Sequence, residues 1–536
     1  MANRRVRDAA FEVMRERGLT TVFANPGSTE VPFLGALPDD LRFVLALHEG
    51  SVVGIATGWA IGRGVPAFVL LHTTAGLGNA VGALATARVN RAPLVVLVGQ
   101  QDRRHLAQEP FLAGRLHGLA GEYPVWVDQP VRAQDVPAAL VRAWHEADSG
   151  RGPALLIVPM DDWLAPAGED GPIAAPARTL QARAADPKAV AELAGMLETA
   201  RSPALVVGAG ADDPETWEGL VRLAERLGCP VWQESFGARA GFPQDHRLFA
   251  GHLPAGRGRL RDTLAGHDLV LSVGAPVFRQ YNYEPGALVA DGTRLALVTD
   301  DPAEAHRSPV DLALLAPPAH VCDALVKDLP TRSGAPPPRP WRPAAPAPPA
   351  EGQPLRAGHV LAALSERLSA ETVLVEEAPS NRPELVARIP ARRPLGFLAA
   401  AMGGLGFGLA AAIGVRMALP TRPVVAVVGD GSSLYSIQSL WSAGRYGVGA
   451  LFVILANGGY AVMDRLAEMQ GESAPWPEFE AIEIATMARA LGCPAKRVED
   501  HDDLLRTLDE VLPGLADRTE PLLLEVVVAP DSDFEV

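Results

Sequence analysis

Hydrophobic positions in this chain gather in short continuous runs, and amphipathic stretches separate one run from the next. Ala67–Leu71, Leu94–Val98 and Val424–Val428 are examples, and each of these runs ends at a glycine or a polar residue. A continuous apolar run of this length is typical of a parallel strand that is buried on both faces. Strand-like runs that alternate with helix-like stretches predict an α/β fold of doubly wound parallel sheets.

Two segments interrupt this alternation and divide the chain. Residues 166–184 and 331–354 are rich in alanine and proline, and this composition predicts extended linkers. We therefore expect three α/β units, at residues 1–165, 185–330 and 355–536. The predicted strands are Thr21–Ala24, Phe43–Leu47, Ala67–Leu71, Leu94–Val98, Ala154–Val158, Ala204–Gly208, Pro230–Gln233, Leu269–Val273, Leu295–Val298, Val424–Val428, Ala450–Leu455 and Leu522–Val528.

The composition is that of a globular protein, and it argues against several classes of function. A net charge of −15 without a basic run argues against nucleic acid as a partner. The three cysteines, Cys229, Cys322 and Cys493, are far apart, which predicts reduced thiols and a cytoplasmic location. The longest apolar stretch, residues 397–419, is dense in glycine and alanine and contains Arg416. We expect a core helix with its entry loop there, and no membrane span.

The most specific pattern lies in the last unit, where two apolar runs each lead to a potential metal ligand. The run Val424–Val428 stops at the sequence GDGS, residues 429–432, and the run Ala450–Leu455 is followed by Asn457. Open α/β sheets bind ligands at the carboxyl ends of neighbouring strands. Glycines let a phosphate approach the backbone, and carboxylate and amide oxygens suit magnesium. The pattern indicates a bound diphosphate with its metal ion.

This pattern resembles that of the thiamine diphosphate-dependent enzymes. The segment AAAMGGLGFGLAAAIG, residues 399–414, resembles the segment that precedes the pattern in that family. The fragments NPGS at residues 25–28 and LALHEG at residues 45–50 narrow the likeness to the benzoylformate decarboxylases. The likeness runs nearly end to end, and it implies pyrimidine-binding, middle and diphosphate-binding domains in that order.

The resemblance also implies the cofactors and the assembly. Thiamine diphosphate and Mg²⁺ (or Ca²⁺) are the expected cofactors, and a homodimer or homotetramer with active sites between subunits is the expected assembly. The expected metal ligands are Asp430, Asn457 and the backbone carbonyl of Gly459. The expected cofactor contacts are Gly403, Leu405, which would hold the cofactor bent, Gly429, Gly431, Ser432, Ser433 and Tyr460.

Three catalytic side chains are implied at strand ends of the first unit. Ser28 is expected to contact the substrate carboxylate, and His72 to transfer protons. Glu49 is expected to bind the aminopyrimidine ring of the cofactor and to promote loss of the proton from its reactive carbon. From the residues alone, a turn serine, a structural histidine and a helix-capping glutamate are the alternative interpretations.

The chain departs from the family in two places. The fragment GAPVFRQYNYEPG, residues 274–286, matches the middle domain, but Tyr281 stands where the family has a second catalytic histidine. Tyr281 is the fourth expected catalytic residue, although a phenol donates a proton but regains it less readily. Whether the decarboxylated carbon takes a proton or adds to an aldehyde is therefore open. Phenylalanines are also missing near two positions of the apolar substrate pocket, Ala399 and Leu466. The expected pocket residues are Phe111, Leu112, Pro379, Ala399, Val462, Met463 and Leu466.

The resemblance therefore predicts a carbon–carbon lyase. The expected reaction is the non-oxidative decarboxylation of an aryl or bulky 2-oxo acid, like benzoylformate, to an aldehyde and carbon dioxide. The alternatives are an aldehyde carboligase or acyloin lyase, and an acetolactate-synthase-like enzyme with bound FAD. The turn GAGA at residues 208–211 would suit a nucleotide, but it is an incomplete dinucleotide motif. A non-catalytic protein that keeps the cofactor site is the remaining hypothesis, and the joint presence of Glu49, His72, Asp430 and Asn457 argues against it.

Overall fold

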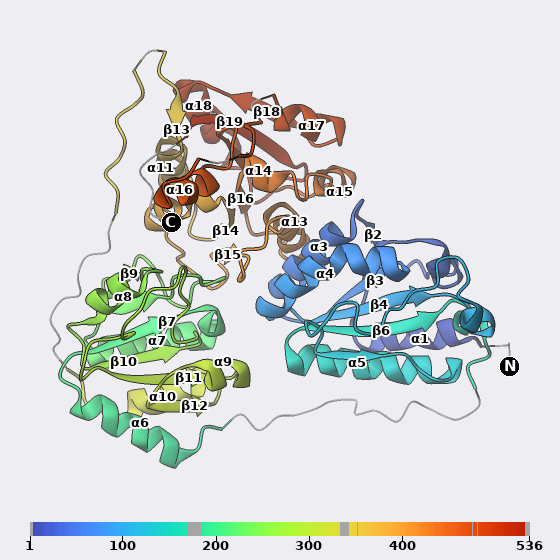
Figure 1. The fold of residues 1–536 in the computed structure, drawn as a ribbon, viewed down its shortest axis with the longest axis horizontal. Coiled ribbons are helices and arrows are strands. Elements are labelled where there is room, and N and C mark those ends of the chain that lie inside the picture. The colour runs from blue at the N-terminus through green and yellow to red at the C-terminus, as the bar shows by residue number, and fades with distance from the viewer. Residues whose placement is uncertain are drawn as a thin grey trace.

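Three parallel sheets with helices on their faces form the computed structural model, and each sheet lies in its own lobe (Figure 1). The structure describes residues 4–168, 184–332, 342–350, 352–473, 475–479 and 481–530. The two predicted linkers, residues 166–184 and 331–354, lie partly outside these residues. The prediction of three α/β units with parallel sheets is confirmed.

The first unit is a six-stranded sheet in the order β2-β1-β3-β4-β6-β5. Helices α3 and α4 pack on one face and α1 and α5 on the other, so the central strands are buried on both sides. The strands are β1 (Thr21–Asn25), β2 (Arg42–Leu45), β3 (Ala67–Leu71), β4 (Leu94–Gln100), β5 (Trp126–Asp128) and β6 (Pro153–Pro159). The helices are α1 (Val6–Glu16), α2 (Val31–Leu34), α3 (Glu49–Arg63), α4 (Thr73–Val89) and α5 (Val136–Gly150).

The middle unit is a six-stranded sheet in the order β12-β11-β10-β7-β8-β9. The strands are β7 (Pro203–Val207), β8 (Val231–Gln233), β9 (Phe249–His252), β10 (Leu269–Val273), β11 (Arg294–Thr299) and β12 (Leu312–Leu315). The helices are α6 (Pro187–Thr199), α7 (Pro214–Leu227), α8 (Arg257–Leu264), α9 (Pro302–Arg307) and α10 (Pro318–Asp328).

The third unit is a seven-stranded sheet in the order β13-β19-β17-β16-β14-β15, with β18 also paired to β19. The strands are β13 (Leu355–Arg356), β14 (Val373–Glu377), β15 (Phe397–Ala399), β16 (Val424–Gly429), β17 (Leu451–Ala456), β18 (Ala495–Val498) and β19 (Leu522–Ala529). The helices are α11 (Ala357–Arg367), α12 (Arg382–Arg388), α13 (Gly408–Ala418), α14 (Asp430–Ser433), α15 (Ser439–Arg445), α16 (Ala461–Met469), α17 (Ile484–Ala490) and α18 (His501–Val511).

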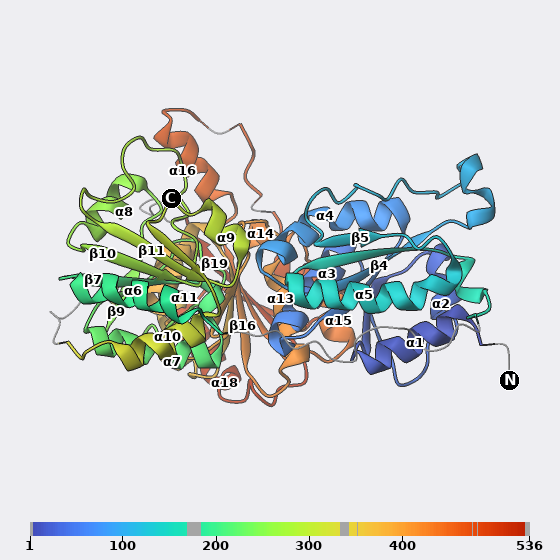
Figure 2. The ribbon, with the colours of Figure 1, turned by 90° about the horizontal axis from the view of Figure 1, so that it is seen from below.

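Helices α3 and α13 lie side by side where the first and third units meet (Figure 1, Figure 2). A Cβ atom on Gly58 would overlap the carbonyl of Ala411, and one on Gly414 would overlap the carbonyl of Ile55. Glycine at these positions therefore lets the two helix backbones approach closely. One apolar core continues through this contact from the first sheet to the third.

Every strand predicted from the sequence is present, with ends that agree within two residues. The stretch 397–419, expected to be a core helix with its entry loop, instead opens with the short strand β15, and helix α13 begins only at Gly408. No helix in the described part of the chain has the length and apolar character needed to span a membrane.

Candidate active site

His72 and Glu30 meet at the carboxyl edge of the first sheet. His72 follows β3, and Glu30 ends the short 3₁₀ turn η1 (Ser28–Glu30) after β1, the strand beside β3. Nδ1 of His72 lies 3.0 Å from Oε2 of Glu30 and 3.0 Å from Oγ1 of Thr29. The Glu30 side chain is fully buried, whereas that of His72 is 16% exposed. A buried carboxylate therefore holds the imidazole through Nδ1, and Nε2 is left for chemistry.

Two glycines make room for this arrangement. A Cβ atom on Gly27 would overlap the ring of His72, and one on Gly99 would overlap the carboxylate of Glu30. The N–H of Gly27 also donates to Oε2 of Glu30 at 2.7 Å. Thr73 has a φ of +26°, which a β-branched residue rarely adopts. Backbone strain of this kind gathers at functional sites, and here it lies directly after His72.

Glu49 begins α3, the helix that follows β2. Its side-chain oxygens accept hydrogen bonds from Nδ2 of Asn25 and Nδ2 of Asn79, both at 3.0 Å. Glu49 is only 8% exposed, so two amide donors hold a nearly buried carboxylate. Ser28 is exposed in the turn after β1. Ser28, Glu49 and His72 thus follow three adjacent strands at one edge of the sheet.

Asp430 and Asn457 follow neighbouring strands of the third sheet, because β16 pairs with β17. Oδ1 of Asp430 accepts from the N–H of Gly431, and Oδ2 from the N–H of Gly458, both at 2.7 Å. Burial raises the pKa of the Asp430 carboxyl, and these backbone donors oppose the shift. Oδ1 of Asn457 accepts from the N–H of Gly459 at 3.2 Å.

The residues around this strand end suit a diphosphate. Oγ of Ser433 donates to the carbonyl of Asp430 at 2.7 Å. A Cβ atom on Gly431 would lie 2.7 Å from the ring of Tyr460, so a larger residue would require that ring to move. Carboxylate, amide and hydroxyl oxygens beside backbone N–H groups fit Mg²⁺ and a diphosphate together. The predicted residues at this edge of the sheet are Gly429, Asp430, Gly431, Ser432, Ser433, Asn457, Gly459 and Tyr460.

The segment between β15 and α13 carries the other predicted cofactor contacts. Gly403 and Gly406 have φ values of +70° and +90°, which glycine adopts without strain. Leu405 is 37% exposed. Glu377, at the end of β14, accepts from the N–H of Gly406 at 2.6 Å and from the N–H of Gly408. Burial raises the pKa of Glu377 to about 7.

Tyr281 has its described contacts within the middle unit. Its ring packs edge-on against Phe236 at a centroid distance of 6.3 Å, and its N–H donates to the carbonyl of Ala255 at 3.3 Å. Tyr281 as a whole residue is 45% exposed. These contacts do not join Tyr281 to the catalytic residues predicted in the first unit.

The predicted pocket residues fall into separate places. Phe111, in a loop of the first unit, is 88% exposed, and Leu112 beside it has a φ of +67°. Pro379 begins the turn η6 (Pro379–Asn381), which packs against α16. Helix α16 carries Val462, Met463 and Leu466, and each of its residues is at least partly exposed. Ala399 differs from the others, because it is 2% exposed and packs in the core of the third unit.

The residues that support the predicted groups are not among those expected from the sequence. Glu30 had a weak signal, because it is a carboxylate in the turn that follows a predicted strand, two residues after the predicted Ser28. Glu377 also ends an apolar run, but the preceding Glu376 shortens that run and hides the strand. Asn79 had no signal, since its contact with Glu49 depends on how α4 packs.

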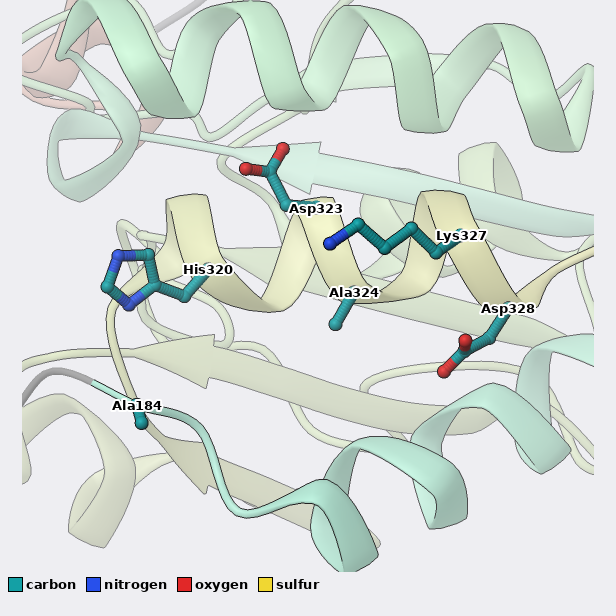
Figure 3. A pocket seen from close by; sticks show the side chains of 6 residues that line it. All are labelled: Ala184, His320, Asp323, Ala324, Lys327 and Asp328. Carbon is teal, nitrogen blue, oxygen red and sulfur yellow. The ribbon is translucent and has the colours of Figure 1, made fainter.

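Two other features of the middle unit contain no predicted site residue. In the turn 208–211, the N–H of Gly210 donates to the carbonyl of Gly274 at 2.8 Å, and this close approach accounts for the glycines. A surface hollow of about 610 Å³ lies along α10 (Figure 3). Its lining residues are Ala184, His320, Asp323, Ala324, Lys327 and Asp328.

Comparison with known proteins assigns all three units to one family. Models of thiamine pyrophosphate enzymes match residues 4–118 (N-terminal TPP binding domain), 190–325 (central domain) and 384–526 (C-terminal TPP binding domain). Benzoylformate decarboxylase of Pseudomonas aeruginosa is 40% identical over 530 residues, which cover 97% of this chain and 98% of the relative. A putative acetolactate synthase large subunit of Mycobacterium tuberculosis is 30% identical, and the match covers 96% of this chain and 99% of the relative.

Solved structures agree with these relatives. The thiamine diphosphate-dependent 4-hydroxybenzoylformate decarboxylase of Rhodococcus jostii RHA1 superposes with a TM-score of 0.93 at 35% identity, over 99% of this chain and 100% of that chain. Benzoylformate decarboxylase of Polynucleobacter necessarius superposes with a TM-score of 0.93 at 34% identity, over 98% of this chain and 99% of that chain. Both likenesses extend through all three units. The chain belongs to the thiamine diphosphate-dependent enzymes.

Proposed function

We propose that the chain decarboxylates an aryl or bulky 2-oxo acid, such as benzoylformate, to an aldehyde and carbon dioxide, with thiamine diphosphate and Mg²⁺. It is a 2-oxo acid decarboxylase, a carbon–carbon lyase, and relatives with decarboxylase names support this class. The proposal rests mainly on the arrangement of Glu49 and His72 at the carboxyl edge of the first sheet. There Glu49 lies between two amide donors and His72 rests on a buried carboxylate.

Each of these groups has a separate task in the proposed reaction. Bound thiamine diphosphate supplies the electron sink for decarboxylation. Glu49 would bind a ring nitrogen of the cofactor and hold a proton there, and this would promote loss of the proton from the reactive carbon. Nε2 of His72 moves protons to and from the substrate oxygen, with Glu30 orienting the ring. Ser28, exposed in its turn, donates to the substrate carboxylate.

Metal binding falls to the third unit. Asp430, Asn457 and the carbonyl of Gly459 would hold Mg²⁺, and Ser432 and Ser433 lie beside them for the diphosphate oxygens. The backbone donors to Asp430 and Asn457 keep both side chains oriented. Residues from the loop at Phe111 and from α16 would line the substrate pocket and complete the proposed site.

We also infer a cytoplasmic homodimer or homotetramer in which a second chain completes each site. Helix α4 begins directly after His72. Thr86, on the same helix, faces Gly404, because a Cβ atom on Gly404 would lie 3.2 Å from Oγ1 of Thr86. Thirteen residue steps (86 − 73) correspond to about 20 Å along a helix. His72 is therefore too far from the Gly403–Leu405 loop of its own chain to act on the same small molecule. The three buried free cysteines suit a reducing compartment.

The direct test is product analysis. Purified protein is incubated with thiamine diphosphate, Mg²⁺ and benzoylformate, and with EDTA in place of the metal as the control. We expect benzaldehyde and carbon dioxide with the metal and little product without it. Benzoin in place of benzaldehyde would identify a carboligase, the alternative that Tyr281 favours. A yellow, FAD-containing protein that forms acetolactate would favour the synthase alternative, and failure to consume any of a panel of 2-oxo acids would contradict the proposal.

A further inference from the structure

All three units of the chain meet at the backbone of Ala401. The N–H of this residue donates to Oδ1 of Asn90, in the first unit, at 3.0 Å. The carbonyl of Ala401 accepts from Nη1 of Arg279, in the middle unit, at 2.7 Å. Ala401 itself belongs to the third unit and lies two residues before Gly403. The start of the predicted cofactor loop is therefore held from two sides by other units.

Arg279 is in turn anchored on the middle sheet. Its Nη2 donates to Oε1 of Glu234 at 3.2 Å, and the Glu234 side chain is 2% exposed. Glu234 directly follows β8, and its N–H donates to the carbonyl of Val207 at the end of β7. Burial raises the pKa of Glu234 to about 7, and the charge of Arg279 opposes this shift. Arg279 thus connects the edge of the middle sheet to Ala401.

The first unit reaches the same segment through helix α4. Asn90 is the C-cap of this helix and is 2% exposed. Thr86, one turn earlier, faces Gly404. Two positions of one helix therefore contact the segment that leads to Leu405. At the far end of the segment, Glu377 holds the N–H of Gly406.

The polar atoms at this junction are costly to bury. Within the described residues, Nε of Arg279, Oε2 of Glu234 and Nδ2 of Asn90 are buried without a hydrogen-bond partner. Unpartnered buried polar atoms lower stability, and apolar side chains would fill the same space at less cost. The contacts with the Ala401 backbone are what these side chains gain in return.

We propose that Asn90 and Arg279 are positioning residues, which grip the backbone of Ala401 and so place Gly403 and Leu405 for thiamine diphosphate. The identity of the ligand rests on the proposed function, whereas the grip on the loop does not. Glu234 orients Arg279 and so supports the same contact with Ala401. The middle unit thereby contributes to cofactor binding through Ala401, without touching the cofactor.

The test compares three variants by two measurements. Arg279→Met and Asn90→Ala, the two grip variants, each remove one hydrogen bond to the backbone of Ala401. Arg332→Met is the matched control, because Arg332 also donates to backbone carbonyls of the middle unit, those of Ala200 and Leu197, both at 2.7 Å. The dissociation constant of thiamine diphosphate is measured by fluorescence titration with Mg²⁺. Amide hydrogen exchange of residues 399–407 is measured in the cofactor-free protein.

We expect each grip variant to raise the dissociation constant roughly tenfold, the size of one lost hydrogen bond to a charged or buried group. Exchange at residues 399–407 should accelerate in both, and Arg332→Met should change neither quantity. Arg279→Lys, which keeps a donor but loses the fork geometry, should fall between wild type and Arg279→Met.

Three results would overturn the proposal. These are an unchanged dissociation constant in both grip variants, unchanged exchange in the segment, or an equal loss in Arg332→Met. If Arg279→Met does not fold, Arg279→Lys and Asn90→Ala decide by the same two measurements. If wild type does not bind thiamine diphosphate, the proposed function fails, while the exchange data still decide whether the loop is gripped.

Discussion

The carboxyl edges of the first and third sheets hold their polar groups in different ways. In the first sheet, side chains support side chains: Asn25 and Asn79 hold Glu49, and Glu30 holds His72. In the third sheet, backbone N–H groups of glycines hold the side chains of Asp430 and Asn457. The two edges have similar topology, but only the first depends on a network of side chains.

Because of this difference, single substitutions act in different ways at the two edges. A side-chain network can be broken by changing one supporting residue, even one that never meets the substrate. Backbone donors remain after every substitution except that to proline, so the third edge is vulnerable mainly at the ligands themselves and at the glycines that place those donors. The first edge should therefore govern turnover, and the third edge should govern affinity for the cofactor.

The largest expected effect is that of Glu49→Gln. Loss of the carboxylate removes the proposed proton-transfer assistance, so kcat should fall by roughly 10²- to 10⁴-fold. Thiamine diphosphate affinity should change much less than kcat, because the glutamine amide can still hydrogen-bond the ring nitrogen and the diphosphate residues are in the third unit. Steady-state assays with benzoylformate and a fluorescence titration of the cofactor measure the two quantities. A parallel loss of cofactor affinity would contradict the division between the two edges.

The next effect is that of Asp430→Ala. Loss of a metal ligand should raise the dissociation constant of thiamine diphosphate about 100-fold, comparable to the loss of groups that support a bound metal. At saturating cofactor and Mg²⁺, much of kcat should return. Isothermal titration calorimetry with and without Mg²⁺ gives the affinity. An Asp430→Ala protein with normal affinity but no turnover would assign Asp430 to the chemistry instead.

A smaller effect tests the support of His72 without touching it. Gly99→Ala places a methyl group against Glu30 and Thr29, which must move, so kcat should fall roughly 10- to 100-fold. The control is Gly195→Ala on α6, where an added Cβ atom meets nothing within 4 Å. Alanine should be neutral or stabilising there. Equal kcat values for the two variants would show that Glu30 does not orient the histidine.

The smallest expected effect concerns stability and pH. The ordinary pKa of the Glu377 carboxyl is 4.5, and burial raises it to about 7 in the folded chain. Between these pH values the folded chain binds more protons than the unfolded chain, so the free energy of unfolding falls as pH rises, by at most about 1.4 kcal/mol per pH unit. Burial also raises the pKa of Asp212 and of Glu234 to about 7, so both carboxyls lower the free energy of unfolding in the same way as pH rises.

Glu377→Gln should remove the share of this pH dependence that belongs to Glu377. The Tm of the cofactor-free wild type should fall more steeply between pH 5 and pH 7 than that of the variant. Calorimetric scans at several pH values measure both slopes. Parallel slopes would mean that Glu377 is ionised throughout, held by the N–H groups of Gly406 and Gly408.

Sequence patterns predict the parts of the molecule that local physics decides. Central strands such as Ala67–Leu71 are apolar throughout, because helices cover both faces, and their ends carry the predicted side chains. Short or mixed strands escape detection, as with β14, which ends in two glutamates, and the three-residue β15. Packing also decides the supporting contacts: Asn79 reaches Glu49 and Asn90 reaches Ala401 only because of the direction of α4.

The close packing of α3 and α13 has a consequence for how substrate enters. Backbones that leave no room for a methyl group at Gly58 or Gly414 cannot slide or hinge past each other without separating completely. We therefore expect the first and third units of one chain to move together. Opening and closing of the proposed site then falls to the contact between the two chains and to the surface pieces of the site, namely the loop around the exposed Phe111 and helix α16, whose residues are all at least partly exposed.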